Sequence, residues 1–403
     1  MNTLSPTSWL QALPRQLAAL DAQQLRRTRR TVAPQQGAHI TVNGQPMLQF
    51  CSNDYLGLAL HPALIEAARD AALHFGVGSG GSPMVSGHST ANAALEQELA
   101  QFLQLPRALY FYAGFATNAS VIPALVGAGD GIFSDALNHA SLIDGCRLSR
   151  ASIQRYPHGD LAALEALLAA SPCARKLVVS DAVFSRDGDV ADSPGLLALC
   201  ERHDALLMLD DAHGLGIRGP QGRGSLAAAG LTGAHASPRV LYMATLSKAA
   251  GAAGGLVAGS EDLIEWLLQT TRSYTFATAA PALLARALQA SLRVIADGDA
   301  LRAQLQARIQ QLRTGLQPLL ARTGWRLLPS DTPIQALVIG DNGAALALME
   351  GLRQRGLWVP AIRPPTVPAG TARLRIALSA AHTAADVAAL VDVLQALADR
   401  GPA

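Results

Sequence analysis

Short apolar runs alternate with Ala- and Leu-rich stretches of helical length through the middle of the chain. The runs predict buried strands, because the strands of a parallel sheet are covered on both faces and read as continuous apolar segments. Strands are predicted at 108–112, 131–134, 177–180, 205–209, 240–244 and 255–258, and helices at 61–75, 90–103, 161–170 and 196–203. This alternation predicts an α/β fold with a mainly parallel sheet and helices on both of its faces.

The two ends of the chain differ from this middle part. Near the N-terminus, Asn43-Gly44 joins two apolar segments, and this pair is typical of a two-residue hairpin turn. Toward the C-terminus the pattern is helical at 282–322 and then gives a strand, a helix, a strand and a closing helix at 334–339, 344–355, 372–378 and 384–399. We therefore expect an N-terminal helix and hairpin segment (1–50), a large domain (51–285) and a smaller C-terminal α/β domain (286–403).

Composition and charge exclude several classes of protein. The formal net charge of +2 is too small to indicate nucleic acid as a partner. No uncharged apolar run is long enough to span a bilayer, and the N-terminus lacks the pattern of a secretory signal. The four cysteines lie far apart without a C-x-x-C pair, which argues against a zinc site or a disulfide framework. We expect a cytoplasmic protein without a metal site.

Two carboxylates follow the predicted strand 205–209, in the stretch Asp210-Asp211-Ala212-His213-Gly214. Ligands of open α/β sheets bind at the carboxyl ends of strands, and a carboxylate buried there requires a cationic partner. A protonated pyridine nitrogen would be such a partner, and His213 could hydrogen-bond a phenolic oxygen on the same ring. A metal site or a helix-capping Asp explains this stretch as well, so the motif alone leaves these alternatives open.

One lysine, Lys248, follows the predicted strand 240–244 within a turn of small residues. Partial burial of a lysine lowers its pKa and makes it a better imine former. Thr245 and Ser247 add hydroxyl groups that could hold a phosphate. An exposed loop lysine is the alternative, which is weakened because the surrounding residues are nearly all small and apolar.

Three further stretches could contribute to the same site. Gly114 lies between a predicted strand and a helix start, where free backbone N–H groups bind phosphate well. His139 follows the next strand, and its flat ring could stack on a flat cofactor, although a lone histidine is more often structural. Arg363 precedes two prolines that hold the backbone extended, so its guanidinium could grip a substrate carboxylate or pair within the small domain.

Together these stretches resemble the α-oxoamine synthase family of fold-type I pyridoxal-phosphate enzymes. The matching segments follow the family's order along nearly the whole chain, at 52–58, 78–82, 113–115, 210–214, 245–248 and 363–368. The resemblance implies a fold-type I transferase with a large sheet domain and a smaller C-terminal α/β domain, pyridoxal 5′-phosphate as cofactor, and a homodimer with shared active sites. The sequence departs from residues common in the family at Ala250, Pro83-Met84 and His88, which bear on substrate fit.

The resemblance also implies a role for each matching residue. Lys248 would hold the cofactor as a Schiff base and later move protons, Asp210 would pair with the pyridine nitrogen, and His213 with the phenolic oxygen. His139 would stack on the ring and face the substrate. The other implied cofactor contacts are Gly114, Phe115, Ser185, Thr245 and, toward a neighbouring subunit's phosphate, Thr278; the other implied substrate contacts are Arg26, Asn53, Arg363 and Thr366.

The branch of the family that this sequence resembles most belongs to biotin biosynthesis. It condenses L-alanine with a pimeloyl thioester on acyl carrier protein or coenzyme A, with loss of carbon dioxide, and this is the expected activity. Glycine-using relatives such as glycine C-acetyltransferase, and serine-using palmitoyl transferases, share the core motifs and are the alternatives. A non-catalytic binding protein is disfavoured because each position that carries chemistry in the family has a matching residue in this sequence. A dinucleotide-binding oxidoreductase is disfavoured because the G-x-G-x-x-G at 76–81 follows a helix instead of a strand.

Overall fold

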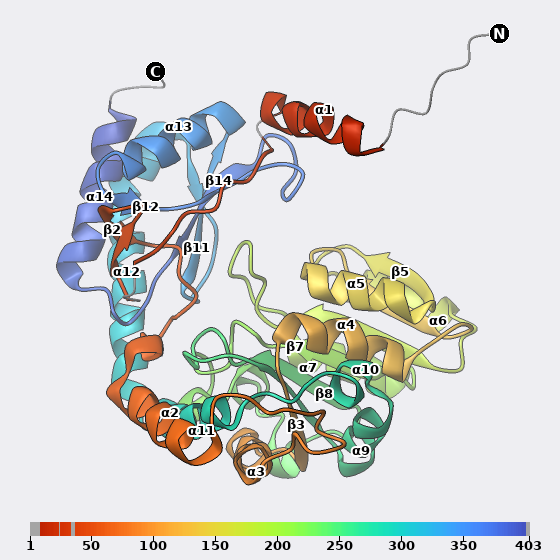
Figure 1. Ribbon diagram of the computed structural model, residues 1–403. Helices are drawn as coiled ribbons and strands as arrows, with labels where there is room; N and C mark the ends of the chain where they lie inside the picture. The colour runs from red at the N-terminus through yellow and green to blue at the C-terminus, as the bar shows by residue number, and fades with distance from the viewer. Residues whose placement is uncertain (1–8, 24, 34–36, 400–403) are drawn as a thin grey trace.

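A seven-stranded sheet forms the centre of the larger part of the molecule (Figure 1). The computed structural model describes residues 9–23, 25–33 and 37–399. Six strands of this sheet run in one direction, and the strand β9 opposes both of its neighbours. The order across the sheet is β3 (Arg107–Phe111), β9 (Gly255–Gly259), β8 (Val240–Thr245), β7 (Leu206–Asp210), β6 (Lys176–Asp181), β4 (Gly131–Asp135) and β5 (Ser152–Tyr156).

Both faces of the sheet are covered by helices. Successive side chains of a strand point to opposite faces, so each strand contributes to two apolar layers. In β7, Leu207 and Leu209 belong to one apolar layer, whereas Met208 between them belongs to a second layer. The first layer includes side chains of α2 (Pro62–Phe75), α3 (Thr90–Leu103), α6 (Leu161–Ala170), α7 (Ser193–Arg202), α8 (Ser225–Ala228) and α11 (Ala282–Ala296). The second includes side chains of α4 (Gly114–Leu125), α5 (Ala140–Ser149), α9 (Glu261–Thr270) and α10 (Arg272–Thr275). The predicted α/β architecture is confirmed.

The C-terminal part has its own antiparallel sheet of four strands. Its order is β10 (Arg326–Leu327), β11 (Ile334–Gly340), β14 (Ala372–Ala377) and β13 (Ala361–Ile362), and it lies with the helices α12 (Asp299–Thr323), α13 (Asn342–Arg353) and α14 (Ala384–Ala398) (Figure 1). The helix predicted at 282–322 is divided into α11 and α12, with Asp297 and Gly298 between them.

The N-terminal segment pairs with this C-terminal part and not with the large sheet. After α1 (Trp9–Ala22), the predicted hairpin is present as β1 (His39–Val42) and β2 (Gln45–Gln49). Asn43 and Gly44 in its turn have the positive φ angles that this turn requires. The strand β2 then pairs in parallel with β12 (Leu357–Trp358), so segments from the N-terminal and C-terminal parts of the chain build one three-stranded sheet (Figure 1).

Two features of the large sheet were not predicted from the sequence. Strand β5 carries the polar sequence Ser-Ile-Gln-Arg-Tyr and lies at an exposed edge, so no apolar run marks it. The antiparallel direction of β9 follows from the short connection between β8 and β9, which leaves no room for a crossover helix. Within the residues that the structure describes, no helix is long and apolar enough to cross a membrane.

The packing of α5 on α4 gives a stability prediction at Gly145. A Cβ atom at this position would lie 2.5 Å from the backbone oxygen of Asn118 and 2.9 Å from Cδ1 of Ile122. We expect Gly145→Ala to lower the free energy of unfolding by about 1–3 kcal/mol, since overpacking a core costs this much. Urea denaturation measures the change. Gly127→Ala, where the nearest atom is 3.9 Å away, is the control and should stay near the wild type, whereas equal effects of both substitutions would contradict this packing.

Candidate active site

Four residues predicted from the sequence meet at the carboxyl edge of the seven-stranded sheet. Asp210 ends β7, His213 follows it, and Lys248 lies just beyond the end of β8. The Lys248 Nζ lies 2.8 Å from His213 Nε2. His139 follows β4 and caps α5, where its Nδ1 accepts a hydrogen bond from the backbone N–H of Ser141. The strand ends therefore bring a lysine, a carboxylate and two imidazoles together.

The carboxylate of Asp210 is buried and is held by neutral donors. It accepts hydrogen bonds from Asn118 Nδ2 at 2.6 Å and from the backbone N–H of Ala212 at 2.9 Å. Asp181 is its register partner on β6. Burial, and then the charge of Asp210, raises the pKa of Asp181 well above its ordinary value. A buried carboxylate held by neutral donors at this edge would be stabilised by a cationic ligand.

Lys248 is poised between its charged and neutral forms. Burial lowers its pKa to about 8, and the negative charges of Asp210 and Asp181 oppose the decrease. At pH 7 roughly a tenth of this amine is therefore unprotonated and able to act as a nucleophile or base, far more than for a lysine of ordinary pKa.

A chain of hydrogen bonds continues from Lys248 through His213 to Tyr55 and Asn53. The Tyr55 hydroxyl donates to Asn53 Oδ1 at 3.0 Å and lies 2.6 Å from His213 Nδ1. The Nδ1–H of His213 accordingly donates to the tyrosine oxygen, and Nε2 accepts from Lys248. Burial and the charge of Lys248 lower the pKa of His213 well below its ordinary value, so this imidazole is neutral.

The start of α4 forms an open cradle beside the end of β8. No side chain caps this helix, so the first backbone N–H groups, including those of Gly114 and Phe115, are available to a ligand. A Cβ atom at Gly114 would lie 2.9 Å from Thr245 Oγ1, so only glycine fits this approach. Thr245 Oγ1 lies 2.8 Å from Ser247 Oγ. Backbone donors and two hydroxyls in this arrangement suit a phosphate group.

Two aromatic rings border the same space. The rings of Phe115 and His139 have centroids 6.4 Å apart and an interplanar angle of 76°, and both residues are exposed. Although its ring has an exposed face, the atoms packed around His139 desolvate it in part and lower its pKa, which favours the neutral imidazole. A flat, uncharged imidazole in this position suits stacking on a planar ligand.

Ser185 and Asn53 are joined by a residue of the small sheet. Arg375 on β14 donates from Nε to the backbone oxygen of Ser185 at 2.6 Å and from a terminal nitrogen to Asn53 Oδ1 at 3.2 Å. The two predicted site residues are therefore held by one guanidinium that comes from the other part of the molecule.

The remaining predicted residues lie at the margins of the site. Thr366 lies on the connection between β13 and β14 that also carries Arg363, and its backbone oxygen accepts from Arg186 at 2.8 Å. Arg26 forms an ion pair with Asp21 at 2.7 Å, and in the described part of the chain it has no contact with the residues around Lys248. Thr278 is exposed and borders a cavity of about 430 Å³ near the start of α4.

Sequence reasoning gave no role to four residues that shape this site, namely Tyr55, Asn118, Asp181 and Arg375. Asp181 ends β6 as Asp210 ends β7, so the rule that ligands bind at strand ends marks it as well. The other three act through side-chain contacts between elements far apart in the chain, for which a single sequence has no local signal.

The family follows from the comparisons with known proteins. The chain belongs to the class I and II aminotransferase family, whose family model matches residues 45–394. It is 76% identical to the 8-amino-7-oxononanoate synthase of Paracidovorax citrulli, over 98% of this chain and 95% of the relative. It is 69% identical to the protein of the same name from Delftia acidovorans, over 98% of both chains.

Solved structures confirm the expected fold class. A structure described as SPT with PLP as an internal aldimine has a TM-score of 0.90 at 29% identity and covers 98% of this chain and 99% of its own. The structure of 8-amino-7-oxononanoate synthase from Francisella tularensis has a TM-score of 0.74 at 26% identity, and the match covers 88% of this chain and 98% of that protein. The chain therefore has the fold of fold-type I pyridoxal-phosphate transferases.

The pKa of Lys248 gives a prediction that the chain's composition makes easy to test, because Lys176 is the only other lysine. An amine reacts with acetic anhydride only when it is unprotonated. In the cofactor-free protein, we expect the acetylation rate of Lys248 to rise with pH and to be half-maximal near pH 8, because burial lowers its pKa to about 8. Peptide mass spectrometry follows the labelling, with Lys176 as the internal standard for the reagent. A half-maximum near the ordinary value of 10.5 would contradict the burial of this amine.

Proposed function

We propose that the protein carries out the reaction of 8-amino-7-oxononanoate synthase, the decarboxylative condensation of L-alanine with a pimeloyl thioester. The observation that carries the proposal is the buried Asp210 carboxylate beside a lysine of lowered pKa, at the strand edge where Thr245 and α4 form a phosphate cradle. The high identity to relatives of that name supports it.

The residues at this edge fit pyridoxal 5′-phosphate. Asp210 offers a buried carboxylate to a protonated pyridine nitrogen, and the phosphate fits the cradle at Gly114 and Thr245. Lys248 is the amine that would hold the aldehyde, and His139 the ring that would stack on it. When bound, the cofactor supplies an electron sink that stabilises a carbanion at the Cα atom of the amino acid.

Side chains of the protein would then transfer the protons and orient the substrate. The neutral Lys248 Nζ takes the Cα proton of alanine and later returns a proton to the product. His213, neutral and fixed by Tyr55, would present Nε2 as a hydrogen-bond acceptor to the phenolic group of the cofactor once Lys248 moves away. Asn53 and Arg363 would orient the alanine carboxylate so that the Cα–H bond faces Lys248, and such orientation is worth several kcal/mol of the barrier.

The acyl donor, the assembly and the location complete the proposal. Arg26 and Thr366 would contact the pimeloyl thioester, whose carrier is acyl carrier protein or coenzyme A. Thr278 would reach the phosphate of a second copy, which makes the enzyme a homodimer with shared sites; its exposure at a cavity near α4 supports this. Four free cysteines support a cytoplasmic location.

The first test identifies the cofactor and its lysine together. The protein is incubated with pyridoxal 5′-phosphate, reduced with borohydride, digested and mapped. We expect the label on Lys248 and not on Lys176, because only Lys248 lies at the cradle. Lys248→Ala should lose the visible imine absorbance and at least ~10³-fold of turnover, as removal of an activated nucleophile or base does. Label on Lys176, or normal turnover of the variant, would refute the assignment.

The second test identifies the substrates. Thiol release from pimeloyl, acetyl, succinyl and palmitoyl thioesters is measured with alanine, glycine and serine as partners. We expect kcat/KM for alanine to exceed that for glycine by about 10–200-fold, because one methyl group in a fitted pocket gives this discrimination. Preference for glycine with an acetyl donor, or serine with a palmitoyl donor, would keep the family and replace the proposed reaction.

A further inference from the structure

A short hairpin links the large sheet to the small one beside the site. Residues 183–190 fold back on themselves through a bridge between Val183 and Val190. Two backbone hydrogen bonds close the loop, from Phe184 N–H to the Asp189 oxygen and from Gly188 N–H to the Phe184 oxygen, both at 2.9 Å. We refer to this segment as the 183–190 hairpin.

The tip of the 183–190 hairpin is held by the small domain. Asp187 forms an ion pair with Arg373, and Arg375 donates to the backbone oxygen of Ser185 at 2.6 Å. At Gly188 the backbone approaches so closely that a Cβ atom would lie 2.3 Å from the Ile334 oxygen. These contacts at the tip therefore fix the position of Arg375, a residue of the small sheet, against the large domain.

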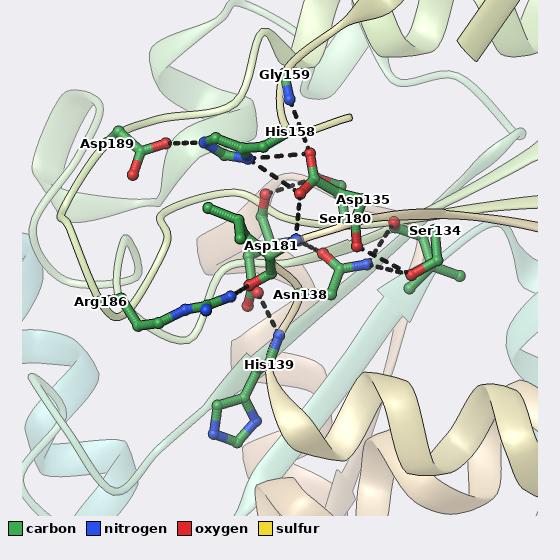
Figure 2. Close-up of polar contacts among 12 residues, drawn as sticks. Ser134, Asp135, Asn138, His139, His158, Gly159, Ser180, Asp181, Arg186 and Asp189 are labelled. Atoms are coloured by element: carbon green, nitrogen blue, oxygen red, sulfur yellow. Dashed lines mark hydrogen bonds and ion pairs between the residues drawn. The ribbon is translucent and has the colours of Figure 1, made fainter. Parts of the chain in front are cut away.

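The base of the hairpin is held by His158, a residue that the proposed reaction does not use. Its Nδ1 lies 3.0 Å from Asp135 Oδ1, and its Nε2 lies 2.7 Å from Asp189 Oδ2, so the ring bridges two carboxylates (Figure 2). The ring also packs edge-on against Phe184, with centroids 4.3 Å apart. Asp189 and Phe184 belong to the hairpin, whereas Asp135 ends β4 of the large sheet.

His158 is a cation at neutral pH. Its hydrogen bonds to Asp135 and then to Asp189 raise its pKa to about 10, although burial opposes the increase. Asp135 is itself buried and also accepts from the backbone N–H groups of Leu137 and Gly159. The bridge therefore joins a fixed carboxylate of the sheet to a carboxylate of the hairpin, and charge-assisted hydrogen bonds of this kind are the strong ones.

The contacts continue from the hairpin into the amino-acid side of the site. The guanidinium of Arg375 that binds the Ser185 oxygen also donates to Asn53 Oδ1, and Asn53 accepts from the Tyr55 hydroxyl. A shift of the hairpin would move the Ser185 oxygen and release Arg375 from the position in which it holds Asn53.

We propose that His158 is a positioning residue: by bridging Asp135 and Asp189 it fixes the 183–190 hairpin, and through Ser185 and Arg375 it holds Asn53 where the amino-acid substrate binds. The part that concerns substrate rests on the proposed function. The part that concerns the hairpin rests on the contacts alone, so the two can fail separately.

The first arm of the test needs no substrate. His158→Gln keeps a polar side chain but removes the positive charge and the reach to both carboxylates. Amide hydrogen exchange of Phe184 and Gly188, measured by mass spectrometry on the complete cofactor-free protein, should be about tenfold or more faster in the variant, since charged hydrogen bonds of this strength are lost. His203→Gln is the matched control, because the side chain of His203 is about as accessible (20%, against 31% for His158) and faces one carboxylate, Glu165, at 3.7 Å. Unchanged exchange in His158→Gln would overturn the proposal.

The second arm separates positioning from general destabilisation. With saturating cofactor, His158→Gln should raise KM for alanine about tenfold and lower kcat by up to about tenfold, because Asn53 both binds and orients alanine, while KM for the pimeloyl thioester stays unchanged. Proportional loss of all three parameters together with a lower melting temperature would instead indicate a purely structural residue and overturn the proposal.

A double-mutant cycle tests the bridge itself. Asp189→Ala should reproduce the rise in KM for alanine, and combining it with His158→Gln should add little, because both substitutions break one interaction. Fully additive effects would show that His158 does not act through Asp189. If the wild-type protein does not condense alanine with a pimeloyl thioester, the proposed function fails, and the exchange arm alone decides the role of the hairpin.

Discussion

The burial of carboxylates at the ends of adjacent strands is the constraint on which the rest of the site depends. Asp181 and Asp210 lie side by side at the carboxyl edge of the sheet, where neither is fully solvated. Asn118 and the Ala212 N–H stabilise Asp210 only with neutral dipoles. Burying these carboxylates costs free energy in the folded protein, and a positively charged ligand at this edge would offset part of that cost. Binding of such a ligand is therefore favoured.

The same two carboxylates determine the state of Lys248. Burial alone would lower the pKa of the amine further, and the negative charges return it to about 8, close to the pH at which a base and an acid form are both available. His213 lies against the amine and stays neutral, so it does not compete for the proton. The buried groups at the strand ends thus set the pKa of Lys248 and with it the acid–base chemistry of the site.

The sequence predicted most of this arrangement because strand ends have a local signal. Asp210, His213 and Lys248 each follow an apolar run, and Gly114 marks a strand-to-helix turn, so periodicity and strand-end chemistry located all four. Strand β5 was missed because its exposed edge has no apolar pattern. Arg375 and Tyr55 were missed because their roles come from contacts between segments more than a hundred residues apart, which follow from tertiary packing and leave no mark in either segment.

The parallel pairing of β2 with β12 has a consequence for how the chain is made. About three hundred residues separate the two strands, so β12 is synthesised long after β2. At about 5–20 residues per second, the N-terminal hairpin waits roughly 15–60 s for its neighbour. By the time β12 is made, the whole seven-stranded sheet has been synthesised, whereas the outer edge of the hairpin is still unpaired. Among the strand pairs of the described residues, the hairpin is therefore synthesised first, and the edge that β12 covers is one of the last to be paired; until then it is an unpaired strand edge, the kind of surface that aggregates or binds chaperones.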